Sequence, residues 1–358
     1  MKKIVLTGGG TAGHVTPNIA LLPALQAAGY ETAYVGSYEG IEKKLIADFN
    51  IPYTGISTGK FRRYLDPKNF SDPFRVMKGF VEARNYLKNY QPDVVFSKGG
   101  FVSVPVVRAA ASLHIPCIIH ESDMTPGLAN KLCIPVAEKV CCNFPETMKN
   151  IPADKAVLTG SPIRAELAEG SKLAGLNMCG FTANKPVIMV IGGSLGAANV
   201  NKAVRDALPK LLEDFQVVHL CGKDKIDNLL LNTPGYKQFE YIKAELKDIF
   251  AMADIVISRA GANAICELLA LKKPNILIPL PAASSRGDQL LNAASFEAQG
   301  YSIVLNEDDI TTNLLVDKVH ELYFNRQNYV DAMSKSHQMD AVKTIMELIN
   351  AAADKKTN

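Results

Sequence analysis

Apolar residues in this chain gather in short runs, and longer segments with helical spacing separate these runs. A short apolar run predicts a strand buried on both faces, and the spaced segments predict helices. The predicted strands are Ile4–Thr7, Glu31–Val35, Asp93–Ser97, Cys117–His120, Lys139–Cys142, Ala156–Leu158, Val187–Ile191, Gln216–Leu220, Phe239–Tyr241, Ile255–Ser258, Asn275–Ile278 and Ser302–Leu305. The predicted helices are Pro17–Ala28, Ile41–Asp48, Phe74–Tyr90, Ser103–Leu113, Gly127–Ile134, Asn199–Leu212, Leu246–Met252, Ala262–Leu271, Gln289–Gln299 and Asn313–Phe324. This alternation indicates an α/β fold with parallel sheets, whose ligands lie beyond the carboxyl ends of the strands.

Two glycine-rich loops divide the chain into similar halves. Gly8–His14 follows the first predicted strand, and Gly192–Ala198 follows the strand Val187–Ile191. A strand, a glycine turn and a helix start together form an anion site, because unpaired backbone N–H groups and the helix dipole point at one place. Two such loops predict a cleft for a phosphorylated ligand.

The chain is long enough for two domains. It has 358 residues, 47% of them hydrophobic, which suffices for two cores. Gly160–Ser171 combines glycine, proline and charge, as a linker does. We expect an N-terminal domain over residues 1–163, completed by a C-terminal helix over 341–358, and a second domain over 164–340.

Composition excludes several classes of protein. A net charge of +3 is too mild to make nucleic acid the main partner. The seven cysteines form no C-x-x-C pair and lie mostly in apolar runs, so we expect reduced core thiols and no metal site. The first residues lead directly into a strand, and no apolar run is long enough to cross a bilayer. We therefore expect no signal peptide and no transmembrane helix.

A nicotinamide-binding protein is one alternative. Gly8, Gly10 and Gly13 match the dinucleotide spacing, which also calls for an acid at the end of the second strand. That strand ends at Ser37, and the nearest acid is Glu39 in the following loop. The dinucleotide interpretation is therefore weak.

Three places carry candidate chemistry. His14 ends the first loop, where an imidazole either caps the turn or accepts a proton from a hydroxyl nucleophile. Glu267 lies among apolar residues of a predicted helix, which favours an inward carboxylate on ribose hydroxyls over a solvated one. Asp288, Gln289 and Asn292 open another helix, and such side chains either suit sugar hydroxyls or reflect ordinary loop polarity.

With these residues assembled, the chain resembles the MurG family, bacterial glycosyltransferases that add N-acetylglucosamine to the lipid-linked muramyl-peptide precursor of the cell wall. The resemblance runs from end to end, through 8-GGGTAGHVTP-17, 92-PDVVFSKGGFVSVP-105, 119-IHESDMTPGLANK-131, 159-TGSPIR-164, 192-GGSLGA-197, 258-SRAGANAICE-267 and 287-GDQLLNA-293. It implies the GT-B architecture, with two Rossmann-like domains whose parallel sheets face a central cleft. The second domain would bind UDP-GlcNAc, and the first would address the undecaprenyl-pyrophosphoryl-muramyl-pentapeptide acceptor.

The resemblance also implies roles for individual residues. Thr11, Ala12 and Gly13 would lie near the pyrophosphate and the acceptor, and Ser194 would meet the donor phosphates. Arg164 would contact the donor, and Ile242 would lie against the uracil. The ribose and phosphates would be lined by Ala262, Asn263, Ala264, Ile265 and Cys266. Glu267 would hold the ribose hydroxyls, and Gln289 would select the sugar, with Asn292 beside it.

The implied reaction is inverting transfer to the C4 hydroxyl of the muramyl sugar. His14 is the first candidate for the base, and Asp123 or Glu121 the second. Many family members carry Asn where this chain has Asp123, so Asn130 is the alternative source of an amide contact. Backbone N–H groups and a helix dipole can stabilise the leaving UDP, and the chain has no D-x-D motif. We expect no required cofactor, although a divalent cation stays open.

The segment Phe74–Lys88 predicts a membrane contact. Its apolar residues cover about half of the helical circumference, and its polar residues are mostly basic, with Lys60, Arg62 and Arg63 upstream. Phe74, Met77 and Phe80 are the expected insertion residues for an anionic cytoplasmic leaflet, and core packing is the alternative. Two other functions stay open: a GT-B relative such as a UDP-GlcNAc 2-epimerase, and a non-catalytic or nicotinamide-binding protein.

Overall fold

The computed structural model describes residues 1–59, 68–193, 197–282, 287–336 and 340–357, without the side chains of 68–73, 356 and 357. The chain forms two compact units. Unit 1 comprises Met1–Arg164 with Asp340–Asn358, and unit 2 comprises Ala165–Met339. These boundaries differ from those expected from the sequence by one residue each.

Unit 1 is built on a parallel sheet with the strand order β3-β2-β1-β4-β5-β6-β7. Its strands are β1 (Lys3–Thr7), β2 (Glu31–Ser37), β3 (Tyr53–Ile56), β4 (Val94–Ser97), β5 (Cys117–Glu121), β6 (Lys139–Cys142) and β7 (Ala156–Leu158). The sequence prediction missed β3, because this short edge strand follows Pro52 and contains Gly55.

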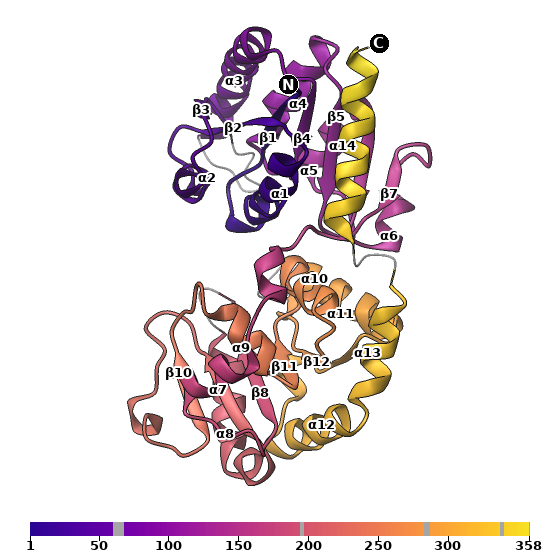
Figure 1. Cartoon of the computed structure of the whole chain (residues 1–358). Coiled ribbons are helices and arrows are strands. Elements are labelled where there is room, and N and C mark those ends of the chain that lie inside the picture. Colours follow the sequence, from indigo (N-terminus) through magenta and orange to yellow (C-terminus); the bar gives the residue numbers. More distant parts are fainter. Residues whose placement is uncertain (60–67, 194–196, 283–286, 337–339, 358) are drawn as a thin grey trace. The chain divides into compact units, whose positions relative to one another are not determined.

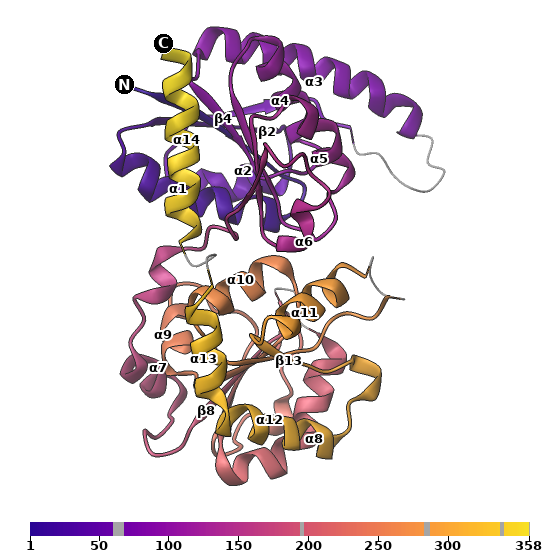
Figure 2. The ribbon, with the colours of Figure 1, turned by 90° about the vertical axis from the view of Figure 1, so that its right-hand side faces the viewer.

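Helices cover both faces of this sheet. They are α1 (Thr16–Ala27), α2 (Ile41–Ile46), α3 (Lys68–Tyr90), α4 (Ser103–Ser112), α5 (Leu128–Cys133), α6 (Pro145–Met148) and α14 (Ala341–Thr357). One core cluster lies under α3, α4 and α5, and the other under α1 and α14. Figures 1 and 2 both show α14 beside α1, although about 320 residues of sequence separate them. Ile345 and Ile349 of α14 are fully buried, so the C-terminal helix completes the core of unit 1.

Unit 2 repeats this architecture with a parallel sheet in the order β10-β9-β8-β11-β12-β13. Its strands are β8 (Val187–Ile191), β9 (Gln216–Leu220), β10 (Tyr236–Phe239), β11 (Ile255–Ser258), β12 (Asn275–Leu277) and β13 (Ser302–Val304). Its helices are α7 (Lys172–Cys179), α8 (Ala198–Asp214), α9 (Leu246–Met252), α10 (Ala262–Ala270), α11 (Asp288–Ala298), α12 (Thr312–Phe324) and α13 (Arg326–Ser334). The strand predicted at Phe239–Tyr241 lies three residues earlier, because Tyr236 and Gln238 alternate inward on this edge strand.

Each sheet has one point at which its strand order reverses. β1 lies between β2 and β4, and β8 lies between β9 and β11. The loops that follow the two central strands diverge there and leave a crevice, which is where parallel α/β sheets bind ligands. In unit 1 these are the loops after Thr7 and after Ser97, and in unit 2 those after Ile191 and after Ser258.

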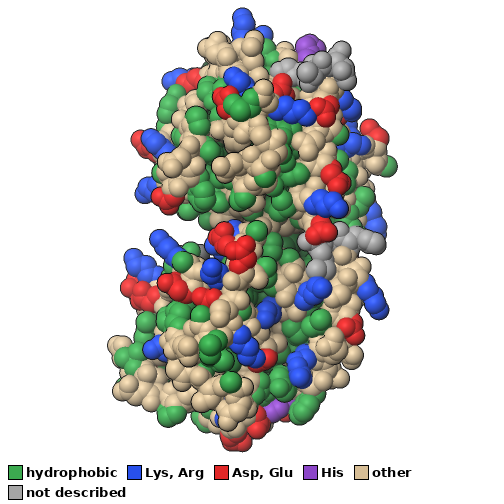
Figure 3. Space-filling view, in the orientation of Figure 1, with side chains coloured by type: hydrophobic (Ala, Val, Ile, Leu, Met, Phe, Trp, Pro, Cys, Tyr) green, Lys and Arg blue, Asp and Glu red, His purple; other side chains and the backbone are tan. Residues whose placement is uncertain are grey.

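The charged surface residues and the cysteines lie where the composition leads one to expect them. On the face drawn in Figure 3, basic and acidic side chains occur over both units. All seven cysteines are buried and free. Among the described helices, none is both long enough and apolar enough to span a membrane.

Candidate functional site

The first glycine-rich loop folds back on itself at the carboxyl end of β1. A Cβ on Gly8 would lie 2.4 Å from the carbonyl oxygen of His14, so only glycine allows this close approach. The loop continues into a short 3-10 helix, Ala12–His14, and then into α1. Thr11 and Ala12 are exposed, and Gly13 and His14 are partly buried. The chain thus places His14 at the crevice of unit 1.

Neighbouring groups hold the His14 imidazole neutral. Burial, the largest effect, and the nearby Lys98 cation together bring its pKa down to about 4, although the Gly9 carbonyl and the Glu42 carboxylate act in the opposite direction. Thr11 Oγ1 lies 3.0 Å from His14 Nδ1. At neutral pH the ring therefore has one nitrogen lone pair available to accept a proton.

Glu121 and Asn130 hold the loop that follows β5. Glu121 is 3% exposed and accepts hydrogen bonds from the backbone N–H groups of Asp123 and Gly127 and from Asn130 Nδ2. Burial raises the pKa of the Glu121 carboxyl, although these hydrogen bonds act to lower it. Asn130 is 5% exposed and also donates to the His120 carbonyl at 3.0 Å. Both were expected to meet substrate, which stays a prediction; in the structure their side chains anchor the loop and α5.

Asp123 follows directly in this loop. Its backbone N–H donates to Glu121 at 2.9 Å, and its carbonyl accepts a hydrogen bond from Thr147 Oγ1. Its side chain is partly buried. Of the two carboxylates proposed as alternative bases, Asp123 is therefore the more accessible one.

The sequence analysis missed a buried lysine at the same crevice. Lys98 follows β4 and is 1% exposed, with its Nζ 2.8 Å from His120 Nδ1 and in contact with Ser122 Oγ. His120 Nε2 lies 2.9 Å from the Gly160 carbonyl oxygen. Burial and Lys98 lower the pKa of His120 well below its usual value. The neutral ring therefore donates from Nε2 to Gly160 and accepts from the Lys98 ammonium at Nδ1.

Glu42 of α2 was also missed. It is fully buried and accepts hydrogen bonds from the backbone N–H groups of Gly10 and Ser37, at 3.1 and 3.0 Å, and from the Ser37 hydroxyl. The dinucleotide spacing pointed to the end of β2, where the nearest acid along the chain is Glu39. Glu42 instead reaches back from the next helix and is occupied by internal hydrogen bonds, which does not favour a dinucleotide site.

In unit 2 the start of α10 faces the reversal point of the sheet. Gly261 begins this helix without a side-chain cap, and a Cβ on Gly261 would meet open space. Ala262, Asn263 and Ala264 are partly exposed, as is Glu267. Ile265 and Cys266 are 0% and 4% exposed, so their side chains pack in the interior of unit 2.

The other predicted donor residues differ in accessibility. Gln289 is partly exposed, and its Oε1 accepts a hydrogen bond from the Leu280 backbone at 3.1 Å. Asn292 is 2% exposed and donates to the Ala260 carbonyl, so it fixes the loop before α10. Ile242 is 5% exposed, and Arg164 is partly exposed at the end of unit 1. Ser194 lies outside the described residues.

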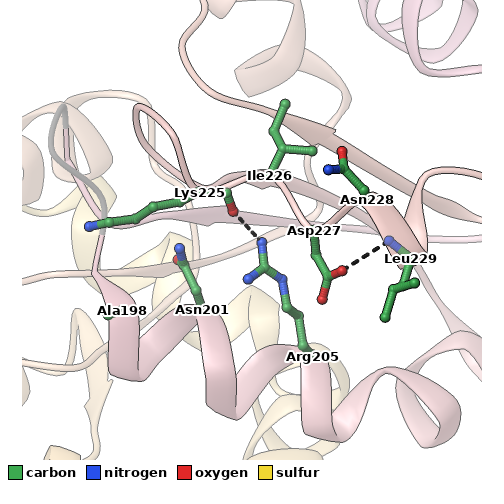
Figure 4. A pocket seen from close by; sticks show the side chains of 8 residues that line it. All are labelled: Ala198, Asn201, Arg205, Lys225, Ile226, Asp227, Asn228 and Leu229. Atoms are coloured by element: carbon green, nitrogen blue, oxygen red, sulfur yellow. Dashed lines mark hydrogen bonds between the residues drawn. The ribbon is translucent and has the colours of Figure 1, made fainter.

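A hollow of about 540 Å³ lies in unit 2 between α8 and the loop after β9 (Figure 4). It is lined by Ala198, Asn201, Arg205, Lys225, Ile226, Asp227, Asn228 and Leu229. Arg205 donates to the Lys225 carbonyl at 2.6 Å, and Asp227 accepts from the Leu229 backbone at 3.0 Å. No predicted donor residue among those that the structure describes lines it.

The helix α3 has two different apolar faces. Phe80, Ala83 and Leu87 pack on the core of unit 1. Phe74, Met77 and Val81 are 78%, 64% and 52% exposed on the other side of the helix. Phe80 is partly buried against the core, whereas Phe74 and Met77 face away from it, so the wide apolar arc comprises two separate surfaces. Lys60, Arg62 and Arg63 lie outside the described residues.

Both units match known domains. Residues 4–142 match the glycosyltransferase family 28 N-terminal domain, and residues 187–349 match the glycosyltransferase family 28 C-terminal domain. Proteins of Lachnospira eligens and Lachnoclostridium phytofermentans are 65% and 64% identical over 349 residues, which are 98% of this chain and 99% and 98% of those proteins. Both are named UDP-N-acetylglucosamine--N-acetylmuramyl-(pentapeptide) pyrophosphoryl-undecaprenol N-acetylglucosamine transferase.

Solved structures show the same architecture. The crystal structure of Acinetobacter baumannii MurG matches with a TM-score of 0.77 and 28% identity, over 98% of this chain and 100% of that chain. A UDP-GlcNAc 2-epimerase from Neisseria meningitidis, bound to UDP-GlcNAc, matches with a TM-score of 0.68 and 15% identity, over 97% and 99%. The likeness to the epimerase concerns the fold alone.

Proposed function

The chain belongs to glycosyltransferase family 28, and we propose that it transfers N-acetylglucosamine from UDP-GlcNAc to the muramyl sugar of undecaprenyl-pyrophosphoryl-muramyl-pentapeptide. The observation that carries this proposal is the 65% identity, along nearly the whole chain, to a transferase named for that reaction. An epimerase is the weaker candidate, because only the fold connects it to this chain.

The donor binds to unit 2 at the start of α10. The first-turn N–H groups and the helix dipole stabilise the diphosphate, and therefore the charge that develops on UDP as it leaves. Glu267, partly exposed on the same helix, accepts hydrogen bonds from the ribose hydroxyls, and Gln289 contacts the sugar. Ser194, Arg164 and the backbone of Ile242 complete the proposed donor contacts. This arrangement needs no divalent cation.

His14 acts as the base. When Nδ1–H donates to Thr11 Oγ1, the lone pair lies on Nε2 and can take the proton of the acceptor's C4 hydroxyl. The hydroxyl oxygen then forms a bond to the anomeric carbon while the bond to UDP breaks. Attack from the side opposite UDP inverts the configuration from α to β. The low pKa keeps His14 neutral, which this step requires.

The exposed face of α3 is the proposed membrane contact. Phe74, Met77 and Val81 would insert between lipids, and Arg75 and Lys78, both exposed, would lie near anionic headgroups. Such a contact would hold the enzyme as a peripheral protein at the cytoplasmic face of the membrane.

One measurement tests the proposed reaction. Purified protein is incubated with radiolabelled UDP-GlcNAc and a synthetic lipid-linked muramyl-pentapeptide, and label is followed into the lipid fraction. Label in the lipid supports the transfer. Conversion of the labelled sugar to N-acetylmannosamine, either free or still linked to UDP, without lipid labelling would instead support an epimerase-type reaction.

A further inference from the structure

The first glycine-rich loop carries its own internal anion. A loop of this kind usually directs backbone N–H groups at a bound phosphate. Here the Gly10 N–H donates to Glu42 Oε2 at 3.1 Å. The same carboxylate accepts from the backbone and hydroxyl of Ser37 at the end of β2. Glu42 thus ties the loop after β1 to the loop after β2.

The packing leaves no room for a second anion at this point. A Cβ on Gly9 would lie 2.5 Å from Glu42 Cδ, so the carboxylate rests directly against the loop backbone. Glu42 has no exposed surface. The Gly10 N–H is therefore not available to a ligand phosphate as long as Glu42 holds this position.

A buried cation lies on the other side of the same loop. Lys98 Cβ would be 3.3 Å from a Cβ on Gly8, and the Lys98 backbone N–H donates to the Thr7 carbonyl at 2.9 Å. The loop between Gly8 and Gly10 is thus flanked by Lys98 after β4 and Glu42 on α2, and His14 closes the loop. The charged or titratable groups that face His14 are these two and His120 on β5.

We propose that Glu42 is a positioning residue whose carboxylate takes the place of a bound phosphate at the first glycine-rich loop and, opposite Lys98, holds His14 in its reactive arrangement. This inference rests on the proposed function in assigning a reaction to His14. The geometry of the loop and its charges does not depend on that assignment.

The two charges act on His14 in opposite directions. The Glu42 carboxylate raises the pKa of His14, and the Lys98 ammonium lowers it. Glu42→Gln keeps the shape of the side chain but removes the charge, so the pKa of His14 should fall. Lys98→Met should raise it. Each shift should be about half a pH unit or more, as expected for a charge at short range.

The test is an NMR titration of the His14 imidazole in the full-length wild-type protein, Glu42→Gln and Lys98→Met. It needs no substrate, so its outcome is separate from that of the transfer assay. Opposite shifts support the proposal. Unchanged titration, or shifts of the same sign, would overturn it, even if Glu42→Gln also lowers the melting temperature. Should Glu42→Gln not fold, a Lys98→Met titration equal to wild type overturns the proposal by itself.

A second variant tests the replacement of a phosphate. Glu42→Ala leaves a carboxylate-sized space beside the Gly10 N–H, and added formate should fill it. We expect formate, but not chloride, to shift the Gly10 amide resonance of Glu42→Ala. Formate should also raise the transfer rate of this variant at least tenfold. Formate should leave the wild-type resonance unchanged. A Gly10 amide that responds to formate equally in both proteins would show that Glu42 does not occupy the anion position.

Discussion

Arg259 and Glu307 form an ion pair at the carboxyl edge of the sheet in unit 2, where their side chains are only 10% and 8% exposed. Arg259 also donates to the carbonyls of Ile278 and Pro279, and Glu307 accepts from Asn199 of α8. The pair therefore connects the ends of β11 and β12, the loop after β13 and the first turn of α8. These are the segments that surround the proposed donor site.

Breaking this pair should destabilise the protein. Arg259→Met leaves the Glu307 carboxylate buried without its cation, and such a loss costs about 3–5 kcal/mol of unfolding free energy. The double variant Arg259→Met with Glu307→Leu should recover most of the loss, because no buried charge remains. The exposed pair Lys202–Asp206 is the control: Lys202→Met should change the unfolding free energy by about 0.5 kcal/mol or less. Urea unfolding of the wild type and the three variants measures this, and equal losses for Arg259→Met and Lys202→Met would contradict it.

Donor recognition should divide between Glu267 and Gln289. Glu267→Ala removes charge-assisted hydrogen bonds to the ribose, worth roughly 1.5–3 kcal/mol, so UDP and UDP-GlcNAc should both bind more weakly. Gln289→Ala should weaken UDP-GlcNAc and spare UDP, because UDP lacks the sugar. Calorimetric titration of each variant with both ligands tests the division.

The Gln289→Ala variant needs a control. Gln289 also accepts a hydrogen bond from the Leu280 backbone, so its removal can disturb the loop before α11. Gln289→Glu keeps that acceptor and should still lose affinity for UDP-GlcNAc. Similar losses of UDP affinity in Glu267→Ala and Gln289→Ala would refute the assignment.

The arrangement of strands and helices could be predicted largely from the sequence, whereas much of the site could not. Apolar runs such as Val187–Ile191, which is followed at once by a glycine turn, favour a buried parallel strand, and the structure has one there. Glu42 and Lys98 escaped notice because they have the side chains of surface residues, and only the fold shows that both are buried. Asn130 and Asn292 show the reverse case. Their amides suit a sugar, and in the structure each donates a hydrogen bond that anchors a loop.

The spacing of apolar residues along α3 was likewise insufficient to predict which of them are exposed. The pattern indicated one wide apolar arc, but it could not separate the residues that pack on the core from those that face outward. Phe80 and Phe74 are chemically identical, and only the position of the sheet decides that Phe80 is packed while Phe74 is exposed.

Membrane binding should depend on the exposed face of α3. Phe74→Asp with Met77→Asp should abolish sedimentation with vesicles that contain anionic lipids, because both apolar side chains are lost and two negative charges are added. The helix should still fold, since neither residue belongs to the described core. Phe324→Asp is the matched control, because Phe324 in unit 2 is 76% exposed and should not contribute. Turnover of a short-chain, water-soluble acceptor should stay near normal, and unchanged vesicle binding by the double variant would rule out this face.

The pH dependence of transfer should reflect the low pKa of His14. The reaction needs the neutral ring, so activity is lost as the pH falls through the pKa and the ring is protonated. Because burial lowers this pKa from 6.5 to about 4, kcat/KM should stay nearly constant from pH 7 to about pH 5 and decline only near pH 4. Circular dichroism at each pH separates this decline from unfolding.

Removal of the base should reduce the chemical step without affecting donor binding. His14→Ala should lower kcat by roughly 10²–10⁴-fold and leave the affinity for UDP-GlcNAc, which we propose binds to unit 2, nearly unchanged. His14→Gln should not restore the rate, because an amide can orient a hydroxyl but cannot accept its proton. The acidic decline in kcat/KM should disappear in His14→Ala. Near-normal turnover in His14→Gln, or an unchanged acidic decline in His14→Ala, would leave His14 with a positioning role and make Asp123, the more accessible of the two nearby carboxylates, the next residue to test.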